Sequence, residues 1–139
     1  MLIAGKQALT MAGDYEQSMS MIQYSTQATA GQMDMLSQQA LQLGQDSVFS
    51  AGEVAAAQLA LAKAGMDVNN VYGSMPGVVA LAAAGDMALA EAAESSANVL
   101  NMWGMAATEN TRVADMLAAA ANGTTADVRD FTMAVSQSG

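Results

Sequence analysis

The chain has 139 residues, of which 53% are hydrophobic and 12% charged, and its 13 acidic and 4 basic residues give a formal net charge of −9. It contains neither cysteine nor histidine, which excludes disulfides, thiolate nucleophiles, cysteine-bound zinc and imidazole chemistry. Four basic residues are too few to form the cationic patch that holds a phosphate backbone, so we expect no direct nucleic-acid binding.

The N-terminal third is predicted to form two helices. Alanine occupies 31 positions and proline only one, a composition that favours helices over strands along the whole chain. The first helix is expected over about 14–30, where Tyr15, Met19 and Ile22 share one face. A second is expected over 32–43, with Met33, Leu36, Ala40 and Leu43 facing inward, Gln38, Gln39, Gln42 and Gln45 facing water, and Gly44 as the stop.

The clearest start signal is the tetrapeptide Ser50-Ala-Gly-Glu53, which has the form of a capping box. In that motif the serine oxygen accepts a free backbone N–H of the first turn while the glutamate reaches back to the serine backbone. We therefore predict a helix over about 51–64. Gly65 follows at the place where a residue in the left-handed conformation would end it.

Two shorter helices are predicted next. Asp67 is a candidate cap for a helix over 68–72. A separate helix is expected to begin at Ser74-Met-Pro76, because proline is tolerated in a first turn, and to stop at Gly85.

The best amphipathic segment follows Asp86, a candidate cap for a helix over 87–103. Gly104 is expected to end this helix, and Trp103 beside it is interpreted as a core anchor in preference to a partner contact. The inner stripe carries Leu89, Ala93, Ser96, Leu100 and Trp103, and the outer stripe carries Glu91, Glu94, Asn98 and Asn101.

The C-terminal part is predicted to form two more helices. Thr108 is expected to cap the first, in which Glu109 and Arg112 pair and Val113, Met116, Leu117 and Ala120 face inward. Asn122 and the following glycine are expected to end this helix as a C-cap. We prefer this interpretation to a glycosylation sequon. A last helix is expected after the Thr124-Thr-Ala-Asp127 capping signal.

The sequence thus predicts an all-α, compact bundle of about seven helices, none much longer than 17 residues, forming a single domain over 1–139.

No motif with a catalytic or cofactor-binding pattern is found, so we expect no enzyme, no cofactor and no metal site. The carboxylate pairs Glu91/Glu94 and Asp127/Asp130 each share a helical face, as acid/base or cation chemistry requires, but both are predicted to lie on solvated faces. The 13 methionines are interpreted mainly as core filling rather than as an adaptable binding surface, with Met19, Met33 and Met116 on inward stripes.

A series of motifs in order along the chain resembles the N-terminal core region of tailed-phage tail tape measure proteins. The resemblance runs from about Thr10 to the C-terminus. Trp103 stands where the family commonly has phenylalanine, and family chains are several times longer, so we expect a fragment of a longer tape measure protein. The motifs are Asp14-Tyr-Glu-Gln-Ser-Met19, Ala40-Leu-Gln-Leu-Gly44, Phe49-Ser-Ala-Gly-Glu-Val54, Leu61-Ala-Lys-Ala-Gly-Met66, Met75-Pro-Gly-Val-Val79, Leu81-Ala-Ala-Ala-Gly85 and Arg112-Val-Ala-Asp-Met-Leu-Ala-Ala-Ala-Ala-Asn122.

This resemblance implies a structural virion component. Family members sit in the lumen of the phage tail tube, set tail length and leave the particle when DNA is ejected. The partners it implies are tail tube and tail tip proteins and tail assembly chaperones, with a homo-oligomer of the parent protein, and the locations are the virion and, during assembly, the host cytoplasm.

The alternative from another class is a membrane-active helical segment that aids DNA passage through the host inner membrane, with membrane contact after ejection. Amphipathic helices such as 87–103 would provide it. Against this alternative, the polar face is acidic and lacks the Lys and Arg of interfacial helices. No apolar run reaches the ~18 residues of a membrane span and no signal peptide is recognised, so the chain is expected to be soluble.

Overall fold

The computed structural model describes residues 2–103, 105–106 and 109–122, and all regular secondary structure among them is helical. The predicted all-α bundle is confirmed, whereas the helix predicted after Thr124 lies outside the described residues. The helices are α1 (Leu2–Thr26), α2 (Ala30–Asp46), α3 (Ala51–Lys63), α4 (Val68–Gly85), α5 (Leu89–Met102) and α6 (Asn110–Asn122).

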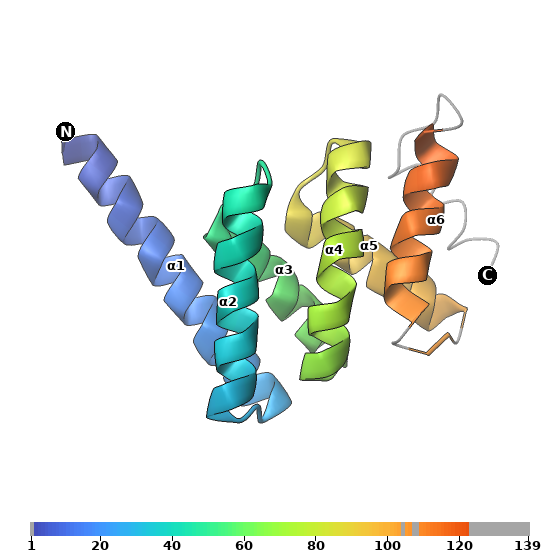
Figure 1. Ribbon diagram of the computed structural model, residues 1–139, viewed down its shortest axis with the longest axis horizontal. Helices are drawn as coiled ribbons and strands as arrows, with labels where there is room; N and C mark the ends of the chain where they lie inside the picture. The colour runs from blue at the N-terminus through green and yellow to red at the C-terminus, as the bar shows by residue number, and fades with distance from the viewer. Residues whose placement is uncertain (1, 104, 107–108, 123–139) are drawn as a thin grey trace.

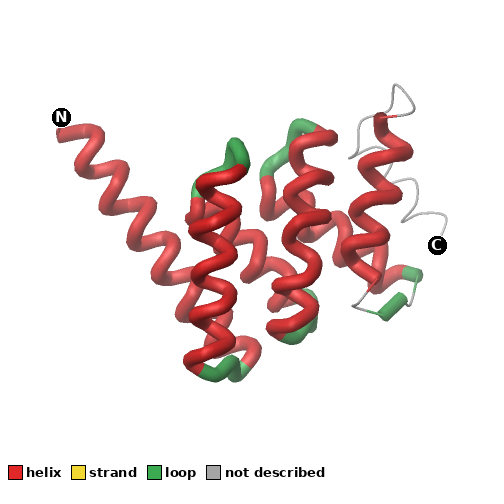
Figure 2. The backbone as a smooth tube through the Cα atoms, in the orientation of Figure 1, coloured by secondary structure: helices red, strands yellow, loops and turns green. Residues whose placement is uncertain are grey.

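Consecutive helices alternate between two layers. In one layer α3 packs between α1 and α5, and in the other α4 packs between α2 and α6 (Figure 1). Helix α3 also contacts α2 and α4 across the layers, so it lies at the centre of the bundle. The N-terminal half of α1 projects beyond the other helices (Figure 2). This alternation resembles the stacked helix pairs of α-solenoids.

The core between the layers is built from small and flexible side chains. Among the described residues, the buried hydrophobic side chains belong to alanine, valine, leucine, isoleucine and methionine, with no aromatic residue. Helix α3 buries Val54, Ala55, Ala57 and Leu61 at the crossing of the two layers. Alanine at such positions lets helix axes approach near the lower end of the usual ~8–10 Å range.

Side-chain caps fix the starts of α2, α3 and α4. The predicted capping box is present: the Glu53 N–H donates to Ser50 Oγ at 3.1 Å, and the Ser50 N–H donates to Glu53 Oε2 at 2.7 Å. Asp67 accepts from the N–H of Asn70 at 2.8 Å, as predicted for a cap. A second capping box, between Thr29 and Gln32, starts α2 and was not anticipated from the sequence.

Helix α1 is longer than predicted, and its boundary with α2 lies earlier. It has 25 residues, because Gly5 and Gly13 weaken a helix without ending it. The break falls at Gln27, whose φ of 57° is left-handed, whereas Gly31 lies inside α2. The predicted boundary at Gly31 is therefore wrong.

Gly44 does not stop α2, which continues to Asp46. Its role is close approach, since a Cβ at this position would lie 2.8 Å from the backbone nitrogen of Ala51. Glycine here allows the start of α3 to fold back onto the last turn of α2.

The end of α3 has the predicted glycine cap, and the end of α4 has an unexpected one. Gly65 has φ 100°, and the N–H of Met66 donates to the carbonyl of Leu61, the pattern of a Schellman motif. Helix α4 stops at Gly85 as predicted, but the left-handed residue there is Asp86, with φ 49°. Asp86 therefore ends α4 and does not cap α5, whose N-cap is Ala88.

Two residues predicted to be in the core lie at the surface. The side chain of Trp103 is 55% exposed because this residue ends α5, beyond the last turn that packs on α3 and α4. Met116 is 50% exposed because α6 turns the neighbouring Val113, Ala114 and Leu117 to the core. The inward positions predicted for Val113 and Leu117 are confirmed.

Candidate functional site

The residues singled out from the sequence are distributed along the fold rather than gathered in one cavity. Ser50 and Glu53 cap α3, Gly65 ends it, Gly85 ends α4, and Asn122 is the last residue of α6. Trp103 lies at the end of α5, and Gly104 falls outside the described residues. These residues shape the helices and do not converge on a reactive centre.

Pro76 is the exception: its own side chain is exposed, but the backbone carbonyl that it leaves without a helical donor takes part in a polar network between helices. The structure shows one continuous helix α4 with Pro76 in its interior, so the prediction of separate helices over 68–72 and 74–85 is wrong. A proline has no N–H, which leaves the carbonyl four residues earlier, that of Tyr72, without its helical donor. Gln39 of α2 supplies the replacement, since its Nε2 donates to Tyr72 O at 2.7 Å.

The network continues from Gln39 into α3. Gln58, which is fully buried, donates from its Nε2 to Gln39 Oε1 at 2.9 Å and to the carbonyl of Leu36 at 3.1 Å. Gln39 is only 8% exposed, so its predicted place on the wet side of α2 is wrong. The two glutamine side chains join α2, α3 and α4 at their crossing.

The acidic residues that the structure describes show no metal-binding arrangement. No group of three or more Asp or Glu side chains suited to a metal ion occurs within the ranges that the structure describes. Glu94 is exposed on α5, as predicted, and Glu91 of the same pair is partly buried. Asp127 and Asp130 lie outside the described residues. Glu109 and Arg112 form the predicted surface ion pair at 3.2 Å.

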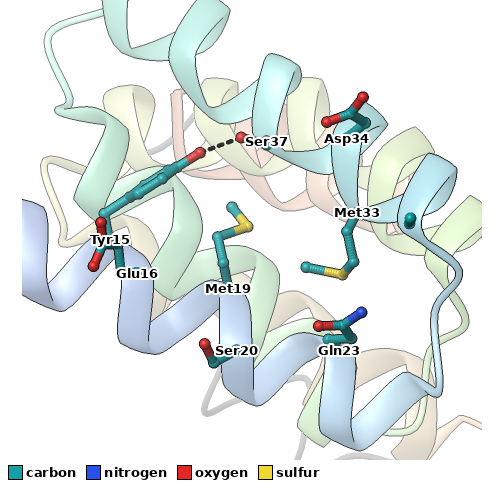
Figure 3. Close-up of a pocket in the computed structure, with 9 residues that line it drawn as sticks. Tyr15, Glu16, Met19, Ser20, Gln23, Met33, Asp34 and Ser37 are labelled. Atoms are coloured by element: carbon teal, nitrogen blue, oxygen red, sulfur yellow. Dashed lines mark hydrogen bonds between the residues drawn. The ribbon is translucent and has the colours of Figure 1, made fainter.

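An open groove of about 520 Å³ lies between α1 and α2 (Figure 3). The side chains of Met19 and Met33 face each other across it, and at one end the hydroxyl of Tyr15 hydrogen-bonds to that of Ser37. The sequence placed Met19 and Met33 on inward stripes but did not indicate that a groove would remain between them. The groove is lined by Tyr15, Glu16, Met19, Ser20 and Gln23 of α1 and by Ala30, Met33, Asp34 and Ser37 of α2.

Comparison with known proteins identifies the family. A family model described as "Phage-related minor tail protein" matches residues 37–139. The chain is also 34% identical, over 128 residues, to the tape measure protein of Pneumococcus phage Dp-1, a match that covers 92% of this chain and 11% of that protein. No solved structure matches. The chain therefore spans about a tenth of the length of this curated relative, and it belongs to the phage-related minor tail protein family.

Proposed function

We propose that this chain is a segment of a tail tape measure protein. The observation that carries the proposal is the 34% identity to the tape measure protein of phage Dp-1, which extends over 92% of this chain. In this role the parent protein sets tail length during assembly and sits in the tail tube until DNA is ejected. Its function is structural, and none of the described residues is assigned a catalytic role.

Surface charge supports this role. The chain carries 13 acidic and 4 basic residues, so its surface repels the phosphate backbone at short range. A protein in the tube lumen shares that channel with the DNA that later passes through it. An acidic surface would keep the two from binding each other.

The partners in this proposal are the tail tube and tail tip proteins and the tail assembly chaperones, with several copies of the parent protein in one tail. Assembly takes place in the host cytoplasm, and the finished protein is in the virion. These partners follow from the proposed role in the tail.

Mass spectrometry of phage particles tests the location. Peptides from residues 14–103 are expected in purified virions and are expected to be depleted from empty particles after ejection triggered in vitro. Peptides of the major tail tube protein serve as the control that stays. Absence of the segment from intact virions, or equal recovery before and after ejection, would contradict the proposal.

Electron microscopy tests the length-setting role. An in-frame duplication of these 139 residues in the parent gene is expected to lengthen the tail uniformly, by at most about 210 Å if the added segment runs as one helix at ~1.5 Å per residue. A silent recoding of the same segment is the matched control. Infectious particles with tails of unchanged length would show that this segment does not contribute to setting tail length.

A second candidate, membrane activity after ejection, has one observation in its favour. Within the described part of the chain no single helix is long and apolar enough to cross a membrane, but α4 and α5 pass that test together, with a bend of 111° between them. Their apolar side chains, including Val78, Leu81 and Leu89, are buried in the bundle, so insertion would require the bundle to open. Flotation with liposomes tests membrane activity. Protein that floats with the liposomes supports it, and protein that stays at the bottom of the gradient favours the tape measure role alone.

A further inference from the structure

The groove between α1 and α2 combines an apolar floor with an acidic rim. Met19 and Met33 form the floor, and both are partly exposed although they pack against the core (Figure 3). Glu16 and Asp34 lie on opposite helices at the rim, and both are exposed. No cationic side chain is present among the residues that line the groove.

The shape of the groove favours a helical occupant. Tyr15 and Gln23 mark its two ends along α1, a span of roughly 12 Å or a little over two helical turns at ~1.5 Å per residue. All regular structure around it is helical, so there is no sheet edge that an extended peptide could join. Methionine side chains are flexible and polarizable, and they adapt to the apolar residues of a docked helix.

Charge selects the kind of helix. A second copy of this chain would bring the same net charge of −9 to an acidic rim, which opposes self-association. A partner with Lys or Arg on either side of an apolar stripe would pair with Glu16 and Asp34 while its apolar residues cover the two methionines. Complementary charge of this kind raises the association rate and excludes acidic competitors.

We propose that the groove between α1 and α2 is a docking site for a basic amphipathic helix of a partner protein. The partner lays two to three apolar side chains on Met19 and Met33 and places cationic side chains against Glu16 and Asp34. This docking site is independent of the proposed tape measure role, because it depends only on the geometry and charge of α1 and α2.

Fluorescence anisotropy with two synthetic peptides tests the charge selection. Both are helices of about 14 residues with the same leucine stripe, and they differ only in having lysine or glutamate beside that stripe. The lysine peptide is expected to bind the 139-residue chain at least tenfold more tightly, with an affinity that falls as salt is added. Equal affinity for the two peptides, or no binding of either, would overturn the proposal.

Charge reversal tests the position of the site. The double variant Glu16→Lys/Asp34→Lys is expected to lose the preference for the lysine peptide. A matched variant, Asp46→Lys/Glu94→Lys, makes the same change in net charge at exposed residues outside the groove and is expected to retain this preference. Circular dichroism confirms that both variants are folded. If both variants lose the preference to the same extent, the binding is only an effect of overall charge.

Methyl NMR of the methionine-labelled chain locates the contact directly. Addition of the lysine peptide is expected to shift the methyl signals of Met19 and Met33 and to leave those of Met102 and Met116 in place. The latter two are exposed elsewhere on the bundle, so they report on unspecific contacts. Shifts confined to Met102 and Met116 would place the peptide outside the groove and refute the assignment.

Discussion

Asp86 holds a backbone conformation that is unfavourable for most side chains. Its φ of 49° is left-handed, and the residue is exposed at the end of α4. Glycine adopts this conformation without the steric cost of a Cβ atom. We predict that Asp86→Gly raises the free energy of unfolding by about 0.5–1 kcal/mol, measured by urea denaturation. A lower denaturation midpoint for this variant would show that the aspartate side chain contributes more than the backbone strain removes.

Gly65 provides the matched control, because the same conformation is already occupied by glycine. Its φ is 100°, and a Cβ placed on it would meet no atom within 4 Å. The only cost of Gly65→Ala is therefore conformational, and we predict a loss of about 1 kcal/mol in the same urea titration. The two variants are expected to change the free energy of unfolding in opposite directions. If Asp86→Gly and Gly65→Ala change it in the same direction, the cost of a side chain in the left-handed conformation does not explain their effects.

At the scale of a helix, a side chain from another helix replaces a hydrogen bond that α4 lacks. Gln39 of α2 satisfies the carbonyl that Pro76 leaves without a donor. We predict that Gln39→Leu lowers the free energy of unfolding by about 1–3 kcal/mol, because Tyr72 O and Gln58 Nε2 each lose a buried partner.

Pro76→Ala should reduce the loss of stability caused by Gln39→Leu, since alanine restores the backbone N–H that bonds to Tyr72 O. In a double-mutant cycle we expect Gln39→Leu to cost at least about 0.5 kcal/mol less in the Pro76→Ala background. Additive effects would mean that the glutamine contributes only through Gln58 and not through the proline-exposed carbonyl.

The start of α5 shows the opposite situation, a helix without a side-chain cap. Ala88 has the extended N-cap backbone, with φ −63° and ψ 145°, and Glu91 stands three residues later. Only a hydroxyl is missing from the capping-box pattern that starts α2 and α3. We predict that Ala88→Ser stabilises the chain by about 0.5–1 kcal/mol in thermal and urea unfolding. As a control, Ser50→Ala should cost about the same amount, and a destabilising Ala88→Ser would contradict the expected cap geometry.

The sequence predicts those features of the helices that depend on residues close together in the chain. The capping box of Ser50 and Glu53, the cap at Asp67 and the left-handed Gly65 each need no more than one turn of sequence. The interior position of Pro76 could not be predicted, because its compensating donor, Gln39, lies 37 residues earlier and on another helix. The groove between α1 and α2 was missed for a similar reason: periodicity places Met19 and Met33 on inner faces but does not determine how closely two helices approach.

For the whole molecule, charge leads to a prediction about DNA. Non-specific affinity for duplex DNA arises chiefly from Lys and Arg that displace counterions, and this chain has 4 such residues against 13 acidic ones. We therefore predict no detectable binding of a 30-base-pair duplex at about 150 mM salt and up to ~100 μM protein, measured by fluorescence anisotropy. A basic DNA-binding protein of similar size is the positive control. Saturable binding below that concentration would refute the idea that the acidic surface leaves DNA free to pass.

The composition of the core leads to a prediction about the stability of the whole bundle. Its buried hydrophobic side chains contain no aromatic residue in the described ranges, and many are alanines, each of which buries little apolar area. We predict a cooperative thermal transition between about 45 and 65 °C, measured by circular dichroism.

A core variant tests whether this transition is the unfolding of the bundle. Leu61 is fully buried in the central helix α3, so Leu61→Ala should lower the free energy of unfolding by roughly 2–5 kcal/mol. In the proposed tape measure role, modest stability would ease unfolding during passage through a narrow tube, so a melting temperature above ~90 °C would argue against release by unfolding.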